Sequence, residues 1–340
     1  MDTSNEDLWQ GQARRRWQIL KWMLFITLGL IALLILTWAY ATQPLIVTPA
    51  KRYSVPADSA RLEADVRRLS EQLSPRDEAH PENLDRAARY IKQEFEKAGG
   101  RVAEQPFEVR GRSYRNVIAR FGAETRERIV VGAHYDTAGA QPGADDNASG
   151  VAGLMELARL LGNAELPLGV ELVAYTLEEP PNFRTPEMGS AVHAASLKRE
   201  GARVSVMFSL EMIGYFSDAE GSQGFPFSIL SLFYPSRGNF IAVVGDVGEG
   251  LLVRRIKKAM LAASSLPVYS INAPAFIPGI DFSDHLSYWN EGYRAVMITD
   301  TAFYRNHAYH TFADTAGRLD YKRMAMVVEG VYGAVLELSR

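Results

Sequence analysis

The sequence predicts an α/β protein with a central, mostly parallel mixed sheet flanked by helices, preceded by one N-terminal transmembrane helix. Three observations predict this fold. Strand-like apolar runs alternate with helix-like amphipathic runs through residues 58–340, which is the pattern of a parallel sheet with helices on both faces. Turns rich in Gly, Pro and Asp separate these runs. A stretch of 19 residues without any charge, from Trp22 to Tyr40, stands in front of them.

The composition limits the classes of function. The 340 residues carry a formal net charge of −3, are 47% hydrophobic and include no cysteine. No basic stripe stands out beyond the N-terminus, so nucleic acid is not an expected partner. Without cysteine, disulfides and thiolate metal sites are excluded, and any metal ion must be held by histidines and carboxylates. The chain has six histidines: His80, His134, His193, His285, His307 and His310.

The N-terminus is predicted to anchor the chain in a membrane. Residues 1–16 are expected to be a cytoplasmic tail, disordered over 1–13, and residues 17–40 are expected to be the transmembrane helix. About 20 apolar residues cross a bilayer as a helix, and aromatic rings favour its two interfaces. Aromatic residues stand near both ends of the stretch: Trp17, Trp22, Trp38 and Tyr40.

The charges around this stretch predict its orientation. Four positive charges precede its uncharged part: Arg14, Arg15, Arg16 and Lys21. Lys51 and Arg52 are the nearest charges that follow it. The excess in front predicts a cytoplasmic N-terminus and a body on the other side of the membrane, periplasmic or extracellular. A cleaved signal peptide is the alternative, because Ala39-Tyr40-Ala41 resembles a cleavage site; the length of the apolar run favours an uncleaved anchor.

The body is expected to be one domain, residues 58–340, that follows a linker. Residues 41–57 contain three prolines and little periodicity, which is typical of a linker. Helices are predicted where apolar residues recur at helical spacing, and strands where short apolar runs are bounded by turn residues. Gly111, for example, marks a turn between two predicted strands. The elements of the first part are, in order, helices near 62–73 and 82–98 and strands near 102–109, 114–121 and 128–133.

The second part of the body continues the alternation of strands and helices. Residues 215–238 interrupt it, are rich in Gly, Ser and aromatic residues, and are expected to be a surface insertion that serves as a substrate-binding lid. The predicted elements are, in order, helix 148–161, strand 169–176, helix 189–200, strand 203–209, strand 239–245, helix 249–264, strand 267–271, a helix from Asp284, strand 294–298 and helix 320–338.

Acidic side chains follow three of the predicted buried strands. Asp146 follows the strand 128–133 through a loop rich in Gly and Ala, Glu178 and Glu179 follow the next strand, and Glu211 ends the third. The carboxyl ends of parallel strands meet at one edge of a sheet. Carboxylates gathered there repel one another and are costly to desolvate, a cost that divalent cations remove. Oxygen and imidazole ligands without sulfur fit Zn²⁺, with Mn²⁺ or Co²⁺ as substitutes.

At these residues the sequence resembles a known family, the co-catalytic zinc aminopeptidases of the M28 type, within the MH clan of metallopeptidases. The resemblance covers residues 60–335, which is nearly the whole body. Each motif alone is a weak signal, but the set in this order and spacing is specific. The motifs are Gly-Ala-His134-Tyr-Asp136, Gly-Ala-Asp145-Asp146-Asn147-Ala-Ser-Gly150, Glu178-Glu179, Glu211-Met-Ile-Gly214, Ser283-Asp284-His285 and His310-Thr-x-x-Asp314-Thr315.

The resemblance implies a zinc-dependent peptidase that removes N-terminal residues from peptides, with two zinc ions as cofactors. Glu178 would be the general base that takes a proton from a water molecule, and Asp136 would accept a hydrogen bond from the ring of His134 and orient it. Glu211 stands where the family often has Asp. Five residues would bind the ions: His134 and Glu211 one of them, Glu179 and His310 the other, and Asp146 both.

Several neighbouring residues leave alternatives open. Asp145 is expected to shape the loop rather than to bind metal, and Asn147 to cap the helix 148–161. Asp314 is a candidate to orient His310, and His285 is expected to support the site rather than to ligate. Candidate substrate contacts precede His310, and the two remaining histidines are expected on the surface or on helices. The contacts are Arg305, Asn306 and His307, and the remaining histidines are His80 and His193.

Two other classes of function remain alternatives to a peptidase. A glutaminyl cyclase-like acyltransferase has the same fold but uses a single zinc ion. A non-catalytic binding protein on this fold is the second alternative, although this chain keeps all five implied ligands and the base. The oligomeric state and the preferred N-terminal residue of the substrate are not predicted by any pattern in the sequence.

Overall fold

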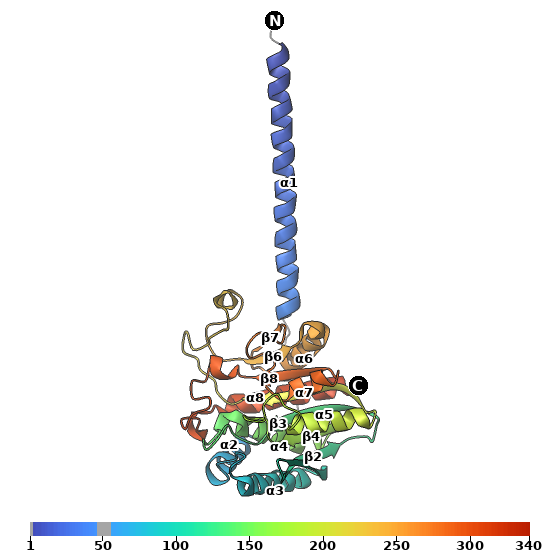
Figure 1. Ribbon diagram of the computed structural model, residues 1–340, viewed down its shortest axis with the longest axis vertical. Coiled ribbons are helices and arrows are strands. Elements are labelled where there is room, and N and C mark those ends of the chain that lie inside the picture. The colour runs from blue at the N-terminus through green and yellow to red at the C-terminus, as the bar shows by residue number, and fades with distance from the viewer. Residues whose placement is uncertain (1–2, 46–55) are drawn as a thin grey trace.

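Eight strands form one mixed sheet in the computed structural model, which describes residues 3–45 and 56–340 (Figure 1). Their order across the sheet is β1-β2-β4-β3-β5-β8-β6-β7. The central strands β4, β3, β5 and β8 are all parallel, β6 pairs with β7 in parallel, and the other three pairs are antiparallel. This arrangement confirms the predicted, mostly parallel mixed sheet. The strands are β1 Arg101–Val109, β2 Arg112–Phe121, β3 Glu127–His134, β4 Gly169–Tyr175, β5 Arg203–Glu211, β6 Ile241–Gly245, β7 Val268–Asn272 and β8 Ala295–Thr299.

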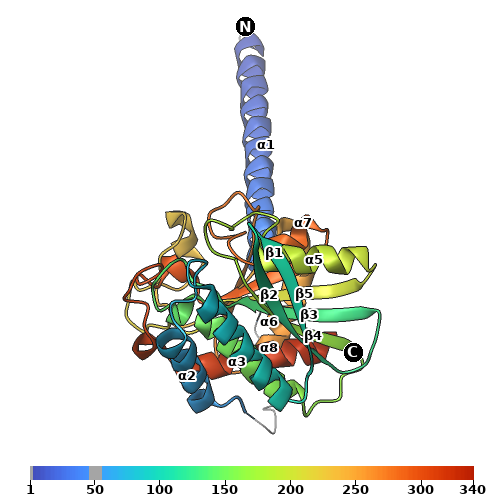
Figure 2. The ribbon, with the colours of Figure 1, turned by 60° about the horizontal axis from the view of Figure 1, so that its bottom comes forward.

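Helices cover both faces of the sheet (Figure 2). The helices α2, α3, α4, α6 and α8 pack together on one face, whereas α5 and α7 pack on the other. Their bounds are α2 Ser59–Arg67, α3 Pro81–Lys97, α4 Gly150–Leu161, α5 Gly189–Arg199, α6 Gly250–Ala263, α7 His285–Asn290 and α8 Tyr321–Leu338. The central strand β3 is buried on both faces of the sheet. Because successive side chains of a strand point to opposite sides, it contributes residues to both cores. Ile129 and Val131 join the larger core on one face, and Val130 joins the smaller core on the other.

One long helix, α1 Thr3–Thr42, projects from the body (Figure 1). Its part from Trp9 to Thr42 is long and apolar enough to cross a membrane. The predicted disorder over residues 1–13 is wrong from Thr3 onward. Residues 1–13 contain no proline and a single glycine, Gly11. The helix of the apolar stretch can therefore extend toward the N-terminus, because each added residue that becomes ordered also gains one backbone hydrogen bond.

The C-terminal end of α1 is bonded directly to the body. Tyr40 Oη donates to the carbonyl of Val247 (2.8 Å), and Lys257 Nζ donates to the carbonyls of Thr42 (3.0 Å) and Gln43 (2.9 Å). The positive charge of Lys257 also interacts favourably with the negative C-terminal end of the helix dipole. The prediction that the linker begins at residue 41 is therefore wrong for residues 41–43; residues 46–55 of the predicted linker lie outside the described part of the chain.

Candidate metal centre

The residues predicted to bind metal lie at one edge of the sheet. His134 is the last residue of β3 and Glu211 the last of β5, its parallel neighbour. On the other side of β3, the end of β4 is level with His134, which pairs with Tyr175. Glu178 and Glu179 follow that strand end after two residues. The parallel arrangement alone therefore brings these four side chains together.

Asp146 lies between the two candidate histidines. Its Oδ1 is 3.4 Å from Nε2 of His134, and its Oδ2 is 3.1 Å from Nε2 of His310. Glu211 joins the His134 side, with Oε2 3.4 Å from His134 Nε2. Glu179 joins the His310 side, with Oε2 3.2 Å from His310 Nε2. The one carboxylate of Asp146 thus faces two separate sets of donors, each made of one histidine and one glutamate.

The chemistry of these donors fits metal ions. Ligand atoms of His134, Asp146 and Glu179 all lie within 4.8 Å of one another. Oε1 of Glu179 and Nδ1 of His134 are buried without a hydrogen-bond partner among the described residues. Burial, together with the nearby negative charge of Asp146, raises the pKa of Glu179 to about 8. Such carboxylates keep their charge at neutral pH only when cations compensate it, and imidazole with carboxylates is a set that zinc accepts.

Without metal, the protein is expected to lose stability as the pH rises from about 5 to 8. Glu179 has its pKa raised from 4.5 to about 8, so its folded form holds a proton that the unfolded form has released. Stability from this group is complete below pH 4.5 and is lost as the pH rises through about 8. His310 acts in the same direction: burial lowers its pKa, but its bonds to Asp146 and Glu179 outweigh that and raise it to about 10.

The measurement is the melting temperature of chelator-treated and zinc-loaded protein between pH 5 and 8. Zinc displaces the protons of its ligands and binds more tightly at higher pH. The zinc-loaded protein should therefore keep or increase its melting temperature over this range, whereas that of the treated protein falls. A treated protein that becomes more stable toward pH 8 would show that these groups are not clustered as described.

Strained and tightly bonded backbone holds the loop that carries Asp146. Gly143 has φ +56°, and a Cβ there would lie 2.3 Å from the carbonyl oxygen of Asp146, so only glycine fits. The side chain of Asn147 accepts hydrogen bonds from the N–H groups of Gly150 and Met212, both at 3.1 Å. Asn147 therefore caps the start of α4, as predicted, and also ties the loop to the end of β5.

Asp314 supports this loop rather than His310. Its carboxylate accepts hydrogen bonds from the backbone N–H groups of Asp145 (2.9 Å) and Asp146 (3.0 Å). The prediction that Asp314 orients the ring of His310 is therefore wrong. The reason is that the segment after His310 turns back across the loop, which places Asp314 beneath the loop backbone. The ring of His310 instead stacks on Tyr309, with ring centroids 3.7 Å apart.

Asp136 holds the backbone of the two adjacent glutamates. Its two carboxylate oxygens accept hydrogen bonds from the N–H groups of Glu178 (3.2 Å) and Glu179 (3.1 Å). Its Oδ1 is 3.5 Å from Nδ1 of His134, a ring nitrogen without a hydrogen bond to any residue that the structure describes. The carboxylate therefore faces the ring that it was predicted to orient, and it also positions the candidate base and a candidate ligand, which the sequence did not predict.

Two further buried groups support the centre and were not predicted to do so. Ser283 Oγ donates to Oε2 of Glu211 (2.7 Å), which fixes the direction of that carboxylate. The guanidinium of Arg76 is completely buried and donates to four backbone carbonyls of the surrounding loops. These belong to Leu69, Tyr135, Pro142 and Gly143. The Ser283 motif was visible in the sequence, whereas a single arginine before helix α3 carries no recognisable signal.

The other candidate residues divide into structural and exposed ones. Asp145 accepts from Gly214 N–H (3.0 Å) and Asn306 Nδ2 (2.8 Å), so it shapes the loop as predicted. Arg305 donates to Gln223 and to two carbonyls inside the body, so Arg305 and Asn306 are structural and not substrate contacts. His285 is buried, as expected of a supporting residue, and the ring of Trp289 packs edge-on against it. His307 remains exposed.

His193 and His80 have different environments. His193 lies on α5, as predicted, but it is buried, with Nε2 2.8 Å from Oε1 of Glu171 and its other ring nitrogen 2.6 Å from the hydroxyl of Tyr288. Of the two predicted settings, surface or helix, His193 therefore has the helix, and a buried acid on β4 provides its partner. His80 lies at the start of α3 next to Asp77 and stays partly exposed.

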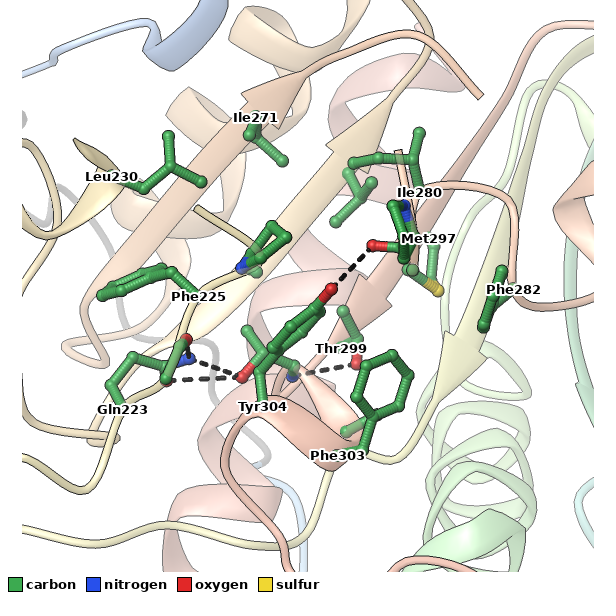
Figure 3. Close-up of a pocket in the computed structure, with 18 of the residues that line it drawn as sticks. Gln223, Phe225, Leu230, Ile271, Ile280, Phe282, Met297, Thr299, Phe303 and Tyr304 are labelled. Carbon is green, nitrogen blue, oxygen red and sulfur yellow. Dashed lines mark hydrogen bonds between the residues drawn. The ribbon is translucent and has the colours of Figure 1, made fainter. Parts of the chain in front are cut away.

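An apolar cavity adjoins the metal centre (Figure 3). The space it encloses, including space open to solvent, is about 890 Å³. Glu211 of the candidate metal centre and Tyr309, the neighbour of His310, line it, and so do residues 223–226 of the predicted lid. The N–H of Gly224 donates to the carbonyl of Tyr304 (2.7 Å), which joins the lid to the segment before His310. The predicted lid and the segment before His310 therefore meet around one cavity.

Comparison with known proteins shows the relationship of the chain. A family model described as peptidase family M28 matches residues 116–335. The protein YfbL of Escherichia coli (strain K12) is 52% identical over 283 residues, which are 81% of this chain and 87% of that protein. Leucine aminopeptidase 1 of Ajellomyces capsulatus (strain H88) is 26% identical over 238 residues, 66% of this chain and 56% of that protein.

Solved structures share the fold. A zinc aminopeptidase from Bacillus subtilis superimposes with a TM-score of 0.67 at 14% identity, over 83% of this chain and 95% of that one. A glutaminyl cyclase of Bacteroides thetaiotaomicron superimposes with a TM-score of 0.65 at 18% identity, over 83% of this chain and 98% of that one. At these identities the similarity concerns the fold, which both kinds of protein have in common.

Proposed function

Because the chain belongs to peptidase family M28, we propose that it is a membrane-anchored di-zinc aminopeptidase. The observation that carries this proposal is the position of Asp146, whose two oxygens lie 3.4 and 3.1 Å from Nε2 of two different histidines. A carboxylate in this position suits a bridge between two ions. The sequence similarity to a leucine aminopeptidase supports the choice of peptide bonds at the N-terminus of the substrate.

Each residue of the centre has a distinct role in this proposal. His134 and Glu211 would hold one ion, His310 and Glu179 the other, and Asp146 both. When bound, the ions supply a Lewis acid for the scissile carbonyl and lower the pKa of water. Glu178 lies on the His134 side, with Oε2 3.9 Å from Nε2 of that ring.

Glu178 would move the proton of the reaction. Burial raises its pKa well above the usual value for a glutamate, so its carboxylate, when the bound cations keep it charged, is a stronger base than an exposed glutamate. It takes a proton from the attacking water, whose oxygen bonds to the carbonyl carbon. It then gives that proton to the amine nitrogen as the C–N bond breaks. Asp136 keeps Glu178 in place through the backbone N–H of that residue.

A glutaminyl cyclase is the second candidate, because a structure of that class matches the fold over 98% of its own length. The two activities give different products. A panel of fluorogenic aminoacyl and dipeptidyl substrates, with a glutaminyl peptide beside it, separates them. An aminopeptidase releases the free amino acid, is stopped by chelator and recovers with zinc. Formation of pyroglutamate without release of amino acids would instead identify a cyclase.

Membrane anchoring and its direction are part of the proposal. The helix from Trp9 to Thr42 has the length and composition of a span, and the positive charges before it favour a cytoplasmic N-terminus. Because the chain lacks cysteine, single cysteines at Ser4 and Lys97 can report the two sides. A membrane-impermeant maleimide should label Lys97→Cys in intact spheroplasts and Ser4→Cys only after lysis. The opposite pattern would reverse the orientation.

A further inference from the structure

Exposed apolar side chains gather around the end of α1. Outside α1, eight large apolar side chains of the described residues are strongly exposed. Six of them belong to two short segments, 227–233 and 247–251, and we name these six residues the apolar collar. They are Phe227, Ile229, Leu232, Phe233, Val247 and Leu251. Single exposed apolar residues are normal, but a group of this kind marks a surface that meets something apolar.

Both segments of the collar flank the C-terminal end of α1. The ring of Phe233 lies 6.3 Å from that of Trp38. On the other segment, the carbonyl of Val247 accepts a hydrogen bond from the hydroxyl of Tyr40 (2.8 Å). Next to Leu251, Gly250 lies so close to Tyr40 that a Cβ would come within 2.7 Å of its ring. Figure 1 shows the gold-coloured turn at 228–232 rising from the body on the side from which α1 projects.

The length of α1 places the collar at the membrane surface. The uncharged stretch from Trp22 to Tyr40 contains 19 residues, which extend about 28 Å as a helix and match the apolar core of a bilayer, about 30 Å thick. Tyr40 then lies at the boundary of that core, and Phe233 and Val247 lie beside it. Aromatic and apolar side chains at this depth are typical of interfacial contact with lipid.

The apolar cavity extends from the metal centre to this same surface. Its lining includes Glu211 of the candidate metal centre as well as Leu230 and Ser270. Leu230 belongs to the collar segment 227–233 but lines the cavity, and Ser270 Oγ donates to the carbonyl of Thr42 at the end of α1 (2.8 Å). In Figure 3, Leu230 and Ile271 lie at the side of the cavity opposite Phe282. The loop therefore presents one face to the cavity and the other to the membrane.

We propose that the collar inserts into the interface of the bilayer and that the cavity receives the apolar amino-terminal end of peptides lying on that bilayer. The first half depends only on the anchor, and the second rests on the proposed aminopeptidase activity. The substrate class is thus a peptide with a free amine and a large apolar first residue, bound at the lipid surface.

The position of the collar is tested on the full chain in vesicles of phosphatidylcholine and phosphatidylglycerol. Leu232→Cys and Leu251→Cys carry an environment-sensitive fluorophore, and Lys97→Cys is the matched control on α3, at the far end of the body from α1 (Figure 1). Lipids with a shallow spin label should quench the two collar probes several-fold more than the control. Equal, weak quenching at all three positions would overturn the proposal. The three side chains are exposed, so the substitutions leave the core intact.

The substrate class is tested by kinetics on two probes. One is an amphipathic peptide with amino-terminal leucine bound to the vesicles, and the other is leucine p-nitroanilide in solution. Leu232→Ser with Leu251→Ser should lower kcat/KM for the bound peptide about tenfold relative to the anilide. An unchanged ratio would contradict delivery from the membrane. A parent chain that cleaves neither probe would instead contradict the aminopeptidase activity, and the quenching result would still decide the position of the collar.

Discussion

Glu178→Gln is expected to keep both zinc ions and to lower kcat by about 10²- to 10⁴-fold. The substitution preserves the size of the side chain but removes its ability to accept a proton. Glu178 lies in the centre next to His134, and its backbone is held by Asp136, so the amide should occupy the same place. The distinguishing feature is the combination of a full metal content with lost turnover.

Zinc content by mass spectrometry and kcat for leucine p-nitroanilide measure the two effects on the same sample. Glu124→Gln is the matched control, because that glutamate is exposed at 84% on the opposite part of the body. The control should retain both metal and activity. Near-normal turnover in Glu178→Gln would remove Glu178 from the role of base, and loss of zinc would make it a ligand.

Asp146→Asn is expected to abolish binding of both ions, whereas Glu211→Gln and His310→Ala should each lose one. The reason is that Asp146 is shared by both sets of donors, and each of the other two residues belongs to one set. Activity of Asp146→Asn should fall to background. At zinc concentrations of 100 to 1,000 times the Kd, each binding event lost also removes about 3–4 kcal/mol of stabilisation.

The measurement is the number of zinc ions per chain after reconstitution, together with the rise in melting temperature on adding zinc. The parent chain should bind two ions, and Asp146→Asn should show no rise. Two ions retained in Asp146→Asn would exclude the bridging role, and one ion in the parent chain would favour a cyclase-like centre. Asp65→Asn on α2 is a carboxylate control outside the centre.

The positions of the candidate metal-binding residues were predictable because they depend on local order along the chain. His134 and Glu211 end buried strands, and a parallel sheet must place such ends at one edge. The boundaries of the strands and helices of the body were predictable within a few residues for the same reason. Apolar runs mark the buried strands, amphipathic runs mark the helices, and turn residues separate them. The family resemblance then assigned roles to residues that the pattern only brings together.

Contacts between distant loops were not predictable. Arg76 donates to backbone carbonyls as far as 67 residues along the chain. Every residue has a backbone carbonyl, so the sequence does not indicate which of them will accept such a bond. Asp314 was assigned to the nearest histidine, but its partners are backbone N–H groups of Asp145 and Asp146. The position of His193 on a helix was predicted, but its burial against Glu171 was not, because nothing near it in sequence shows that acid on β4.

The bonds from Lys257 and Ser270 to the end of α1 have a kinetic consequence. If α1 anchors the chain as proposed, these bonds hold the body at one height above the bilayer, and the enzyme and a peptide on the same membrane then meet by diffusion in two dimensions. The rate should then depend on the number of peptides per lipid rather than on their number per volume of buffer. Adding empty vesicles that exchange peptide should slow the reaction, whereas diluting the whole suspension should leave turnover per enzyme unchanged.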